Sequence, residues 1–522
     1  MRVCIHVKFR DVIARIVLLA WLACVAAWTQ IPGTTGAVGS SRPIALSPSG
    51  HEASTGAVSV QQSATAGGAE TINSSTQIGG GFQGSVPSED VPFGAITLTL
   101  GDAVRRGLET NLGALTANYS ARAAGAQRAQ QLSYLLPNVS VSASETDTQI
   151  NLAAYGFKFN VPPGLNNFSI PSVVGPFSYS QLQGNFSATV WDPVLRRNWQ
   201  ASKESERAAI LSAKDARELV VLAVAGTYLQ MLATAARVDS QRAQVENARA
   251  VNQQAEVRKT AGTNSRIDVV RTLVELETQR QRLNALEADV RKQKIGLARL
   301  IGLPLDRQVI LSEALGFPPL TVPDSAAEIR HAFASRPDLK AAQAQVQAAE
   351  RVVSAARAER LPSASISGDF GVSGPNPAST HGVFAVTGSV SVPIWLGGRV
   401  KADIEQAEAT LAQRKAELAD QQGQVEQEVR TALIELETAV GQVRLAQQNR
   451  GYASETLREA RDRFGLGVAT TVEVVQAQEQ VASAESDYVS SLYSFELARV
   501  ALARATGEAE KELPDLLKAA QP

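Results

Sequence analysis

Residues 258–281 read RKTAGTNSRIDVVRTLVELETQRQ, and residues 463–486, placed 205 positions later, read RFGLGVATTVEVVQAQEQVASAES. This offset brings Gly262 onto Gly467 without a gap. It also aligns Asp268 with Glu473, Gly302 with Gly507, and the heptad series Val269, Leu276, Leu283, Val290, Leu297 with Val474, Val481, Tyr488, Phe495, Leu502. An ungapped match over roughly a hundred residues indicates a duplicated unit, so the two halves are predicted to fold alike.

Composition narrows the class of protein. The chain has 522 residues, only 5% aromatic residues and a net charge of −1, so no basic field indicates nucleic acid. Its four histidines lie far apart, without metal-ligand spacing. The sequence shows no catalytic nucleophile paired with a general base and no phosphate-binding loop. We therefore expect neither an enzyme nor a cofactor.

The N-terminus carries basic residues followed by a short apolar run, Ile16 to Ala27, which predicts a secretory signal peptide over residues 1–28. Both cysteines, Cys4 and Cys24, fall inside it. Lipidation at Cys24 is an alternative that the bulky Trp21 disfavours. Residues 29–95 are mostly Ser, Thr, Gly, Ala, Gln and Val, and we interpret them as a disordered leader.

Each half then shows the order helix, strand, strand, long helix, helix. The strands are expected at about 138–149 and 181–191 in the first half, and at about 363–373 and 383–393 in the second. A polar loop is expected over about 151–180. The helices before the strands are expected to run unbroken to about Leu136, and from about Asp324 to Leu361. Long helices are expected over about 195–259 and 399–463, each about 95 Å long.

The strands alternate apolar residues with Ser, Thr and Asn over 10 to 12 positions. This pattern suits a tilted transmembrane strand with lipid on one face and water on the other. A soluble sandwich is the alternative. Because four strands cannot close a barrel and open edges are not tolerated in lipid, the membrane interpretation requires an oligomer.

The long helices carry an apolar seam every seven residues, which predicts side-by-side packing. In the second half this seam is Ile404, Leu411, Leu418, Val425, Ala432, Ala439, Ala446 and Ala453. A coiled-coil rod in the cell envelope would explain the helices but not the strands.

Several local motifs occur in a fixed order: residues 96–103 (ITLTLGDA), 135–137 (LLP), 336–339 (RPDL), 393–399 (PIWLGGR) and 463–468 (RFGLGV). Together with the duplication, they resemble the TolC-type outer-membrane efflux and secretion channels. The resemblance covers about residues 96–507. It implies a first repeat at 96–303, an equatorial connecting segment at 304–335, a second repeat at 336–507 and a C-terminal tail at 508–522.

The resemblance also implies the assembly. A homotrimer would form a 12-stranded barrel in the outer membrane and a long periplasmic α-helical barrel, which together conduct substrates outward. The implied partners are a periplasmic adaptor protein and an inner-membrane pump or ABC transporter, as in tripartite efflux or type I secretion. A periplasmic coiled-coil adaptor or a structural envelope protein is the alternative function. The cargo stays open.

The family's acidic residues after the tip glycine place Glu473 as the candidate for a constriction at the periplasmic gate, with Asp268 as its counterpart. A second acidic ring of the family is replaced here by Gln476, and a basic partner by Ala469. A ring of three Glu473 side chains predicts a raised pKa and a preference for cations. The alternative is an ordinary acid at a helix N-terminus.

The tip turns, residues 259–266 and 464–471, are where an adaptor would dock. The docking candidates are Gly262, Phe464, Gly465, Leu466, Gly467 and Thr470. Trp191 and Trp395 occupy equivalent strand-to-helix junctions, where we expect them to anchor at the membrane interface.

Overall fold

The computed structural model describes residues 42–43, 57–63, 71–77, 80–87, 94–152, 154, 156, 172–263, 265–319, 322–513 and 517. The predicted signal peptide, including Cys24, lies outside these residues. The following concerns the compact unit that begins at Pro43.

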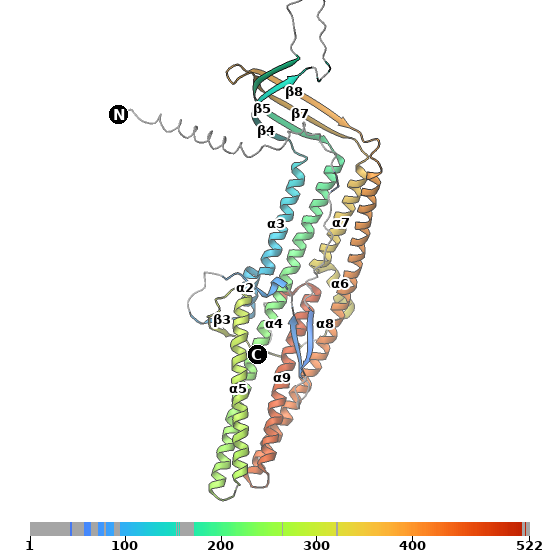
Figure 1. Ribbon diagram of the computed structural model, residues 1–522. Coiled ribbons are helices and arrows are strands. Elements are labelled where there is room, and N and C mark those ends of the chain that lie inside the picture. Colours follow the sequence, from blue (N-terminus) through green and yellow to red (C-terminus); the bar gives the residue numbers. More distant parts are fainter. Residues whose placement is uncertain are drawn as a thin grey trace, which may run out of the picture. The chain divides into compact units, whose positions relative to one another are not determined.

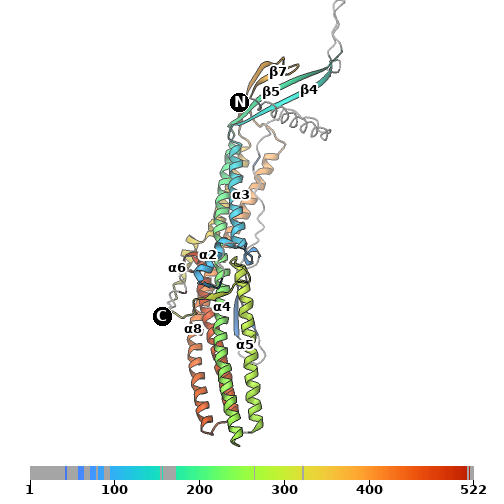
Figure 2. The same cartoon turned by 90° about the vertical axis from the view of Figure 1, so that its left-hand side faces the viewer.

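Two long helices run through this unit, α4 (Pro193–Thr260) and α8 (Arg399–Gly465), and each measures about 100 Å. Shorter helices pack beside them: α2 (Leu100–Thr110), α3 (Leu112–Ser133), α5 (Arg266–Leu300), α6 (Ser325–Ser335), α7 (Pro337–Ala358), α9 (Thr471–Thr506) and α10 (Ala509–Glu512). Near the strands α4 lies between α3 and α7, and farther along it lies between α5 and α9 (Figures 1 and 2). The long helices match the predicted bounds within two residues.

The shorter helices of each half meet end to end. Gly302, just after α5, lies so close to Thr110 at the end of α2 that an added methyl group would stand 2.7 Å from the threonine side chain. A methyl group added at Gly507, just after α9, would stand 3.0 Å from Arg336 at the start of α7. The two contacts are equivalent positions of the duplicated unit.

Two predicted helices are each split. The first divides at Asn111, whose backbone is extended. The Asn111 side chain caps α3 by accepting a hydrogen bond from the Gly113 amide at 2.9 Å. The second divides at Arg336, because Pro337 disfavours a helical conformation for the residue before it. The expectation of unbroken helices was wrong at both places.

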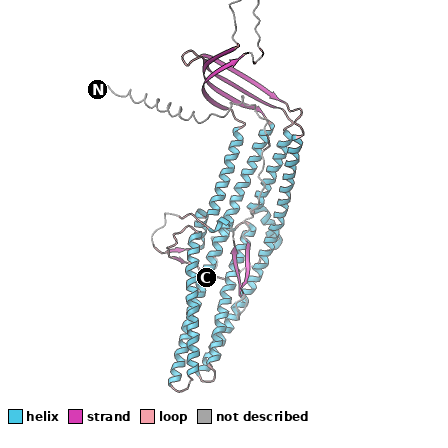
Figure 3. Ribbon diagram, in the orientation of Figure 1, coloured by secondary structure: helices cyan, strands magenta, loops and turns pink. Residues whose placement is uncertain are grey.

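Four strands form one antiparallel sheet in the order β4 (Asn138–Asn151), β5 (Val173–Trp191), β7 (Ser363–Gly374) and β8 (His381–Ser391) (Figure 3). β5 begins at Val173 rather than near 181, because Val173, Val174 and residues 177–180 pair with the end of β4. The predicted loop over 151–180 is therefore shorter than expected.

The sheet has one apolar and one polar face. Directly paired residues share a face, so Val141, Gly184, Phe370 and Phe384 lie in one row across the apolar face. The next row belongs to the other face and reads Ser140, Asn185, Asp369, Ala385. The polar side chains bond across strands, as in Asn185 Nδ2 to Ser142 Oγ at 3.1 Å.

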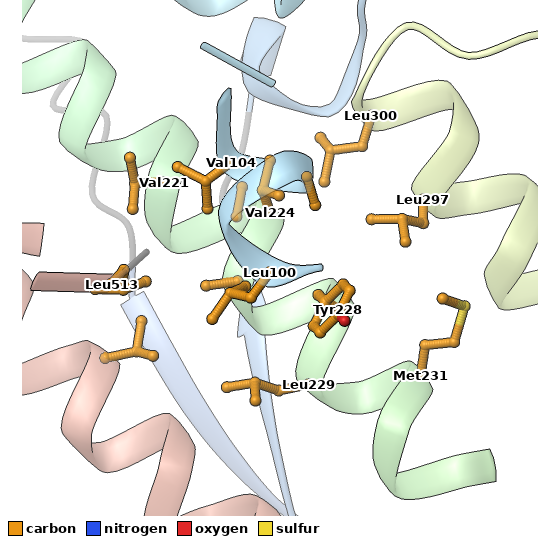
Figure 4. Close-up of a cluster of buried hydrophobic side chains, with 14 of the residues drawn as sticks. Leu100, Val104, Val221, Val224, Tyr228, Leu229, Met231, Leu297, Leu300 and Leu513 are labelled. Carbon is orange, nitrogen blue, oxygen red and sulfur yellow. The ribbon is translucent and has the colours of Figure 1, made fainter. Parts of the chain in front are cut away.

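The largest core cluster joins both halves of the chain. It gathers side chains of α2, α4, α5 and α9 around Tyr228, whose hydroxyl donates to the Leu98 carbonyl oxygen at 3.0 Å (Figure 4). A short parallel pair, β3 (Ile96–Leu98) with β6 (Val309–Leu311), borders it. An apolar stretch of α4 is long enough to cross a membrane, with mean hydropathy 1.8, but 78% of it is buried inside the structure, so it is core.

Both ends of the described chain add to this core. Leu513 and Leu517 are buried in it, so the predicted C-terminal tail contributes packing. In the predicted disordered leader, β1 (Ala57–Ser63) pairs with β2 (Thr71–Gln77), and a 3-10 turn, η1 (Gly80–Gln83), follows. Phe82 packs over Gly113, and its carbonyl oxygen accepts from Asn111 Nδ2 at 2.7 Å. The prediction that the whole leader is disordered was wrong. Composition does not reveal that Phe82 forms a hydrogen bond with the buried Asn111.

Candidate functional site

The tip turns connect α4 to α5 and α8 to α9. Because α4 leaves the sheet at Pro193, its far end lies about 100 Å from the strands. Gly262 has φ 74° and Gly467 has φ 79°, the left-handed conformation that favours glycine after a helix end. The structure thus places the two predicted turns at equivalent ends of the duplicated unit.

Both predicted gate acids cap a helix. The Thr470 hydroxyl accepts from the Glu473 amide at 3.4 Å, and the Glu473 carboxylate accepts from the Thr470 amide at 3.1 Å. Ser265 and Asp268 form the same capping box on α5. The spacing of a hydroxyl residue and an acid three positions later was the signal for this role in the sequence.

The pKa of Glu473 is lowered by the hydrogen bonds from the Thr470 amide and hydroxyl, with a smaller contribution from the charge of Arg463 at 3.9 Å. In the single chain this is opposite to the raised pKa predicted for a ring. In the single chain Glu473 is therefore a charged acid at a helix N-terminus, and its place in a ring of three stays a prediction.

Phe464 is buried rather than available for docking. Its ring packs with Val251, Leu457 and Val474, and 3% of the residue is exposed. Arg258 covers the ring at 4.1 Å, and its Nη2 donates to the Phe464 carbonyl oxygen at 2.6 Å. The sequence prediction of Phe464 as an adaptor-docking residue is therefore corrected, because the side chain is buried. Arg258, which the sequence reasoning missed, joins the end of α4 to the end of α8.

The other tip candidates are exposed. Leu466 is 81% exposed, and Gly262, Gly465, Gly467 and Thr470 are also open to solvent. Gln476 is exposed on α9, one turn beyond Glu473. Val468, at 66% exposure, belongs to the same surface.

A second link between the two helical hairpins lies on α5 and α9. Glu479 accepts from Arg282 Nη1 at 3.1 Å and from Gln279 Nε2 at 3.2 Å. Gln241 on α4 joins this group by donating to the Gln279 side-chain oxygen at 2.6 Å. These polar residues occupy helix positions where the sequence shows no distinct motif.

At the other end, Trp191 closes β5 and Trp395 follows β8. Trp191 is 53% exposed and Trp395 is 83% exposed, beside an almost fully exposed Ile394. Neither indole belongs to a core cluster of the described residues. Over the same part of the chain, no group of three or more His, Cys, Asp or Glu side chains could hold a metal ion.

Comparison with known sequences identifies relatives. Residues 329–508 match the family model described as outer membrane efflux protein. The pyoverdine export outer membrane protein OpmQ of Pseudomonas putida is 25% identical over 342 residues, which cover 63% of this chain and 70% of that protein. The outer membrane efflux protein BepC of Brucella suis biovar 1 is 27% identical over 269 residues, covering 50% and 58% of the two chains.

Solved structures share the fold. The Campylobacter jejuni outer membrane channel CmeC has a TM-score of 0.68 at 17% identity, covering 85% of this chain and 96% of that one. The Vibrio cholerae outer membrane protein VceC has a TM-score of 0.65 at 20% identity, covering 78% and 96%.

The predicted TolC-like fold is confirmed by the similarity of this chain to these outer-membrane channel structures. The matched family consists of outer-membrane transport channels, so the protein is a transporter located in the outer membrane and not an enzyme. The second half of the chain, residues 329–508, thus matches the outer membrane efflux protein family, and the chain has the TolC-type fold of the solved outer-membrane channels.

Proposed function

We propose that three copies of this chain form one tunnel from the periplasm to the exterior. The observation that carries this proposal is the two-faced, four-stranded sheet with open edges. Within the described residues, β4 and β8 each pair on one side only. Their free backbone groups cannot face lipid unpaired, whereas three such sheets joined edge to edge would give a closed barrel of 12 strands.

The helical part has free edges as well. α5 and α8 flank the inner pair α4 and α9, and each carries exposed apolar side chains. On α5 these are Ile267, Val270 and Val274, and on α8 they are Ile434, Leu445 and Tyr452. Because the α5 edge and the α8 edge present different surfaces, they suit head-to-tail contacts between copies, and such contacts can close into a ring. We therefore place α5 of one copy against α8 of the next.

The proposed tunnel serves an efflux pump. Its partners would be a periplasmic adaptor docked on the exposed tip residues, such as Leu466 and Val468, and an inner-membrane pump. The relatives named for export and efflux support small-molecule efflux over protein secretion. Trp191 and Trp395 would anchor the barrel at the periplasmic interface of the outer membrane, where amphipathic rings are favoured.

Conductance tests this function directly. Purified protein in detergent should migrate as a trimer, and its addition to a planar lipid bilayer should give discrete conductance steps. A folded monomer that stays in solution and leaves the bilayer silent would overturn the proposal, and would favour an envelope rod or an adaptor.

The charge of the entrance gives a separate prediction. Because the pKa of Glu473 is lowered, three such carboxylates would favour cations at the proposed periplasmic gate. Glu473→Gln should reduce the ratio of cation to anion permeability about twofold or more, while glutamine still completes the capping box. Gln476→Glu, which adds an acid one turn away, should raise the ratio. Reversal potentials in a salt gradient measure both, and unchanged ratios would remove Glu473 from the gate.

A further inference from the structure

A groove of about 1080 Å³ lies along α4, walled on its two sides by α3 and by the start of α7. The turn after α9 closes one end. Its lining includes Tyr119 and Arg122 of α3, Ile210 and Lys214 of α4, and Lys340 of α7. All of these residues come from one chain, and Tyr119 and Ile210 are 60% and 46% exposed.

The groove contains an excess of positive charge. Its three carboxylates have partners: Glu510 accepts from Arg217 Nε at 3.0 Å, Glu206 lies 3.2 Å from Arg128, and Glu218 accepts from the Glu510 amide at 3.2 Å. In contrast, Arg122, Lys214 and Lys340 have no carboxylate within 4.0 Å among the described residues. Lys340 donates to the Ser335 carbonyl oxygen at 3.1 Å.

The distance of the groove from the sheet indicates which ligand could reach it. Lys214 lies about 30 Å along α4 from Pro193, where the helix leaves the sheet. With the sheet in the outer membrane, as proposed above, α4 extends about 100 Å into the periplasm, the compartment that contains the cell wall. Wall peptides are short, carry free carboxylates and contain apolar methyl groups between them.

We propose that this groove binds the carboxylate-bearing peptides of the cell wall. Arg122, Lys214 and Lys340 would pair with the carboxylates, and Tyr119 and Ile210 would contact the methyl groups. The inference depends on the outer-membrane location and goes beyond the proposed channel. Wall binding would hold the channel at a fixed position in the envelope.

Co-sedimentation of the full chain in detergent with purified, insoluble cell wall tests this proposal. Arg122→Glu, Lys214→Glu and Lys340→Glu combined should weaken binding about tenfold or more. A charge-matched control, Arg291→Glu, Lys294→Glu and Arg330→Glu, changes residues outside the groove and should bind as the unaltered chain does. Wall whose carboxylates have been amidated should bind neither the unaltered chain nor the control.

Unchanged binding by the groove variant would overturn the proposal. Equal loss in the control would also overturn it, since net charge alone would then explain binding. Because Lys340 has an internal hydrogen bond, the double variant Arg122→Glu with Lys214→Glu serves if the triple variant does not fold. Channel conductance should persist in every folded variant, so a failure of wall binding is distinguishable from a failure of the channel.

Discussion

Phe370→Arg is expected to abolish assembly in the outer membrane. Phe370 lies in the middle of β7, opposite Phe384 on the apolar face, and is 75% exposed in the single chain. If this face contacts lipid, an arginine near the bilayer midplane costs about 2–4 kcal/mol per copy, or about 6–12 kcal/mol in a trimer. Heat-modifiable trimers in outer-membrane fractions measure the outcome, and we expect almost none.

The matched control is Ser367→Arg on the same strand. Ser367 pairs with Ser187 and Thr387, so it belongs to the polar face. An arginine there would face water in the lumen, and trimers should form normally with altered conductance. Trimers lost with Ser367→Arg and kept with Phe370→Arg would reverse the assignment of the two faces.

Arg336→Ala is expected to destabilise each chain by about 3–5 kcal/mol, because it leaves the carboxylate of Asp338, whose side chain is only 14% exposed, without its partner. Arg336 is 2% exposed and donates to Asp338 at 3.0 and 2.6 Å, to Glu428, and to the Ala505 carbonyl oxygen at 3.3 Å. It thereby joins α7 to α8 and α9. Urea unfolding followed by circular dichroism measures the loss.

The same cluster predicts sensitivity to acid. Burial alone would raise the pKa of Asp338, but the hydrogen bonds and charge of Arg336 bring it down to about 2, below the ordinary 3.8. A lowered pKa gives stability that is complete above about pH 4 and is lost as the pH falls towards 2, amounting to about 2 kcal/mol. In Arg336→Ala this acid-dependent part should disappear.

Arg330→Ala is the control, since Arg330 is exposed on α6 and no ion pair includes it among the described residues. Arg336→Lys should fall between the two, because an ammonium cannot form the bidentate contact. A free energy of unfolding for Arg336→Ala within about 0.5 kcal/mol of the unaltered chain would contradict a structural role for the cluster.

Local sequence patterns predict much of the fold. The offset of 205 residues predicts two equivalent helical hairpins, and the structure contains them as α4 with α5 and α8 with α9. In the seam on α8, Val425, Ala432, Ala439 and Ala453 are buried, while the other four positions are partly buried. These features follow from periodicity and helix breakers, which act within a few neighbouring residues.

The candidate site was less predictable. Glycine pairs located the tips, yet they did not show that Phe464 is buried under Arg258, which lies 206 positions earlier in the chain. A phenylalanine beside glycines in a turn is ordinarily exposed. Here packing between two hairpins decides otherwise.

The sequence by itself determined the two long helices, the tip turns and the alternating apolar residues of the four main strands, because propensity and periodicity are local properties. Only the tertiary structure decided that Phe82 packs over Gly113, that Arg336 joins three helices, and that Arg122, Lys214 and Lys340 line one groove. Such contacts join residues far apart in the chain. Their partners are fixed by how whole helices pack, which no local pattern records.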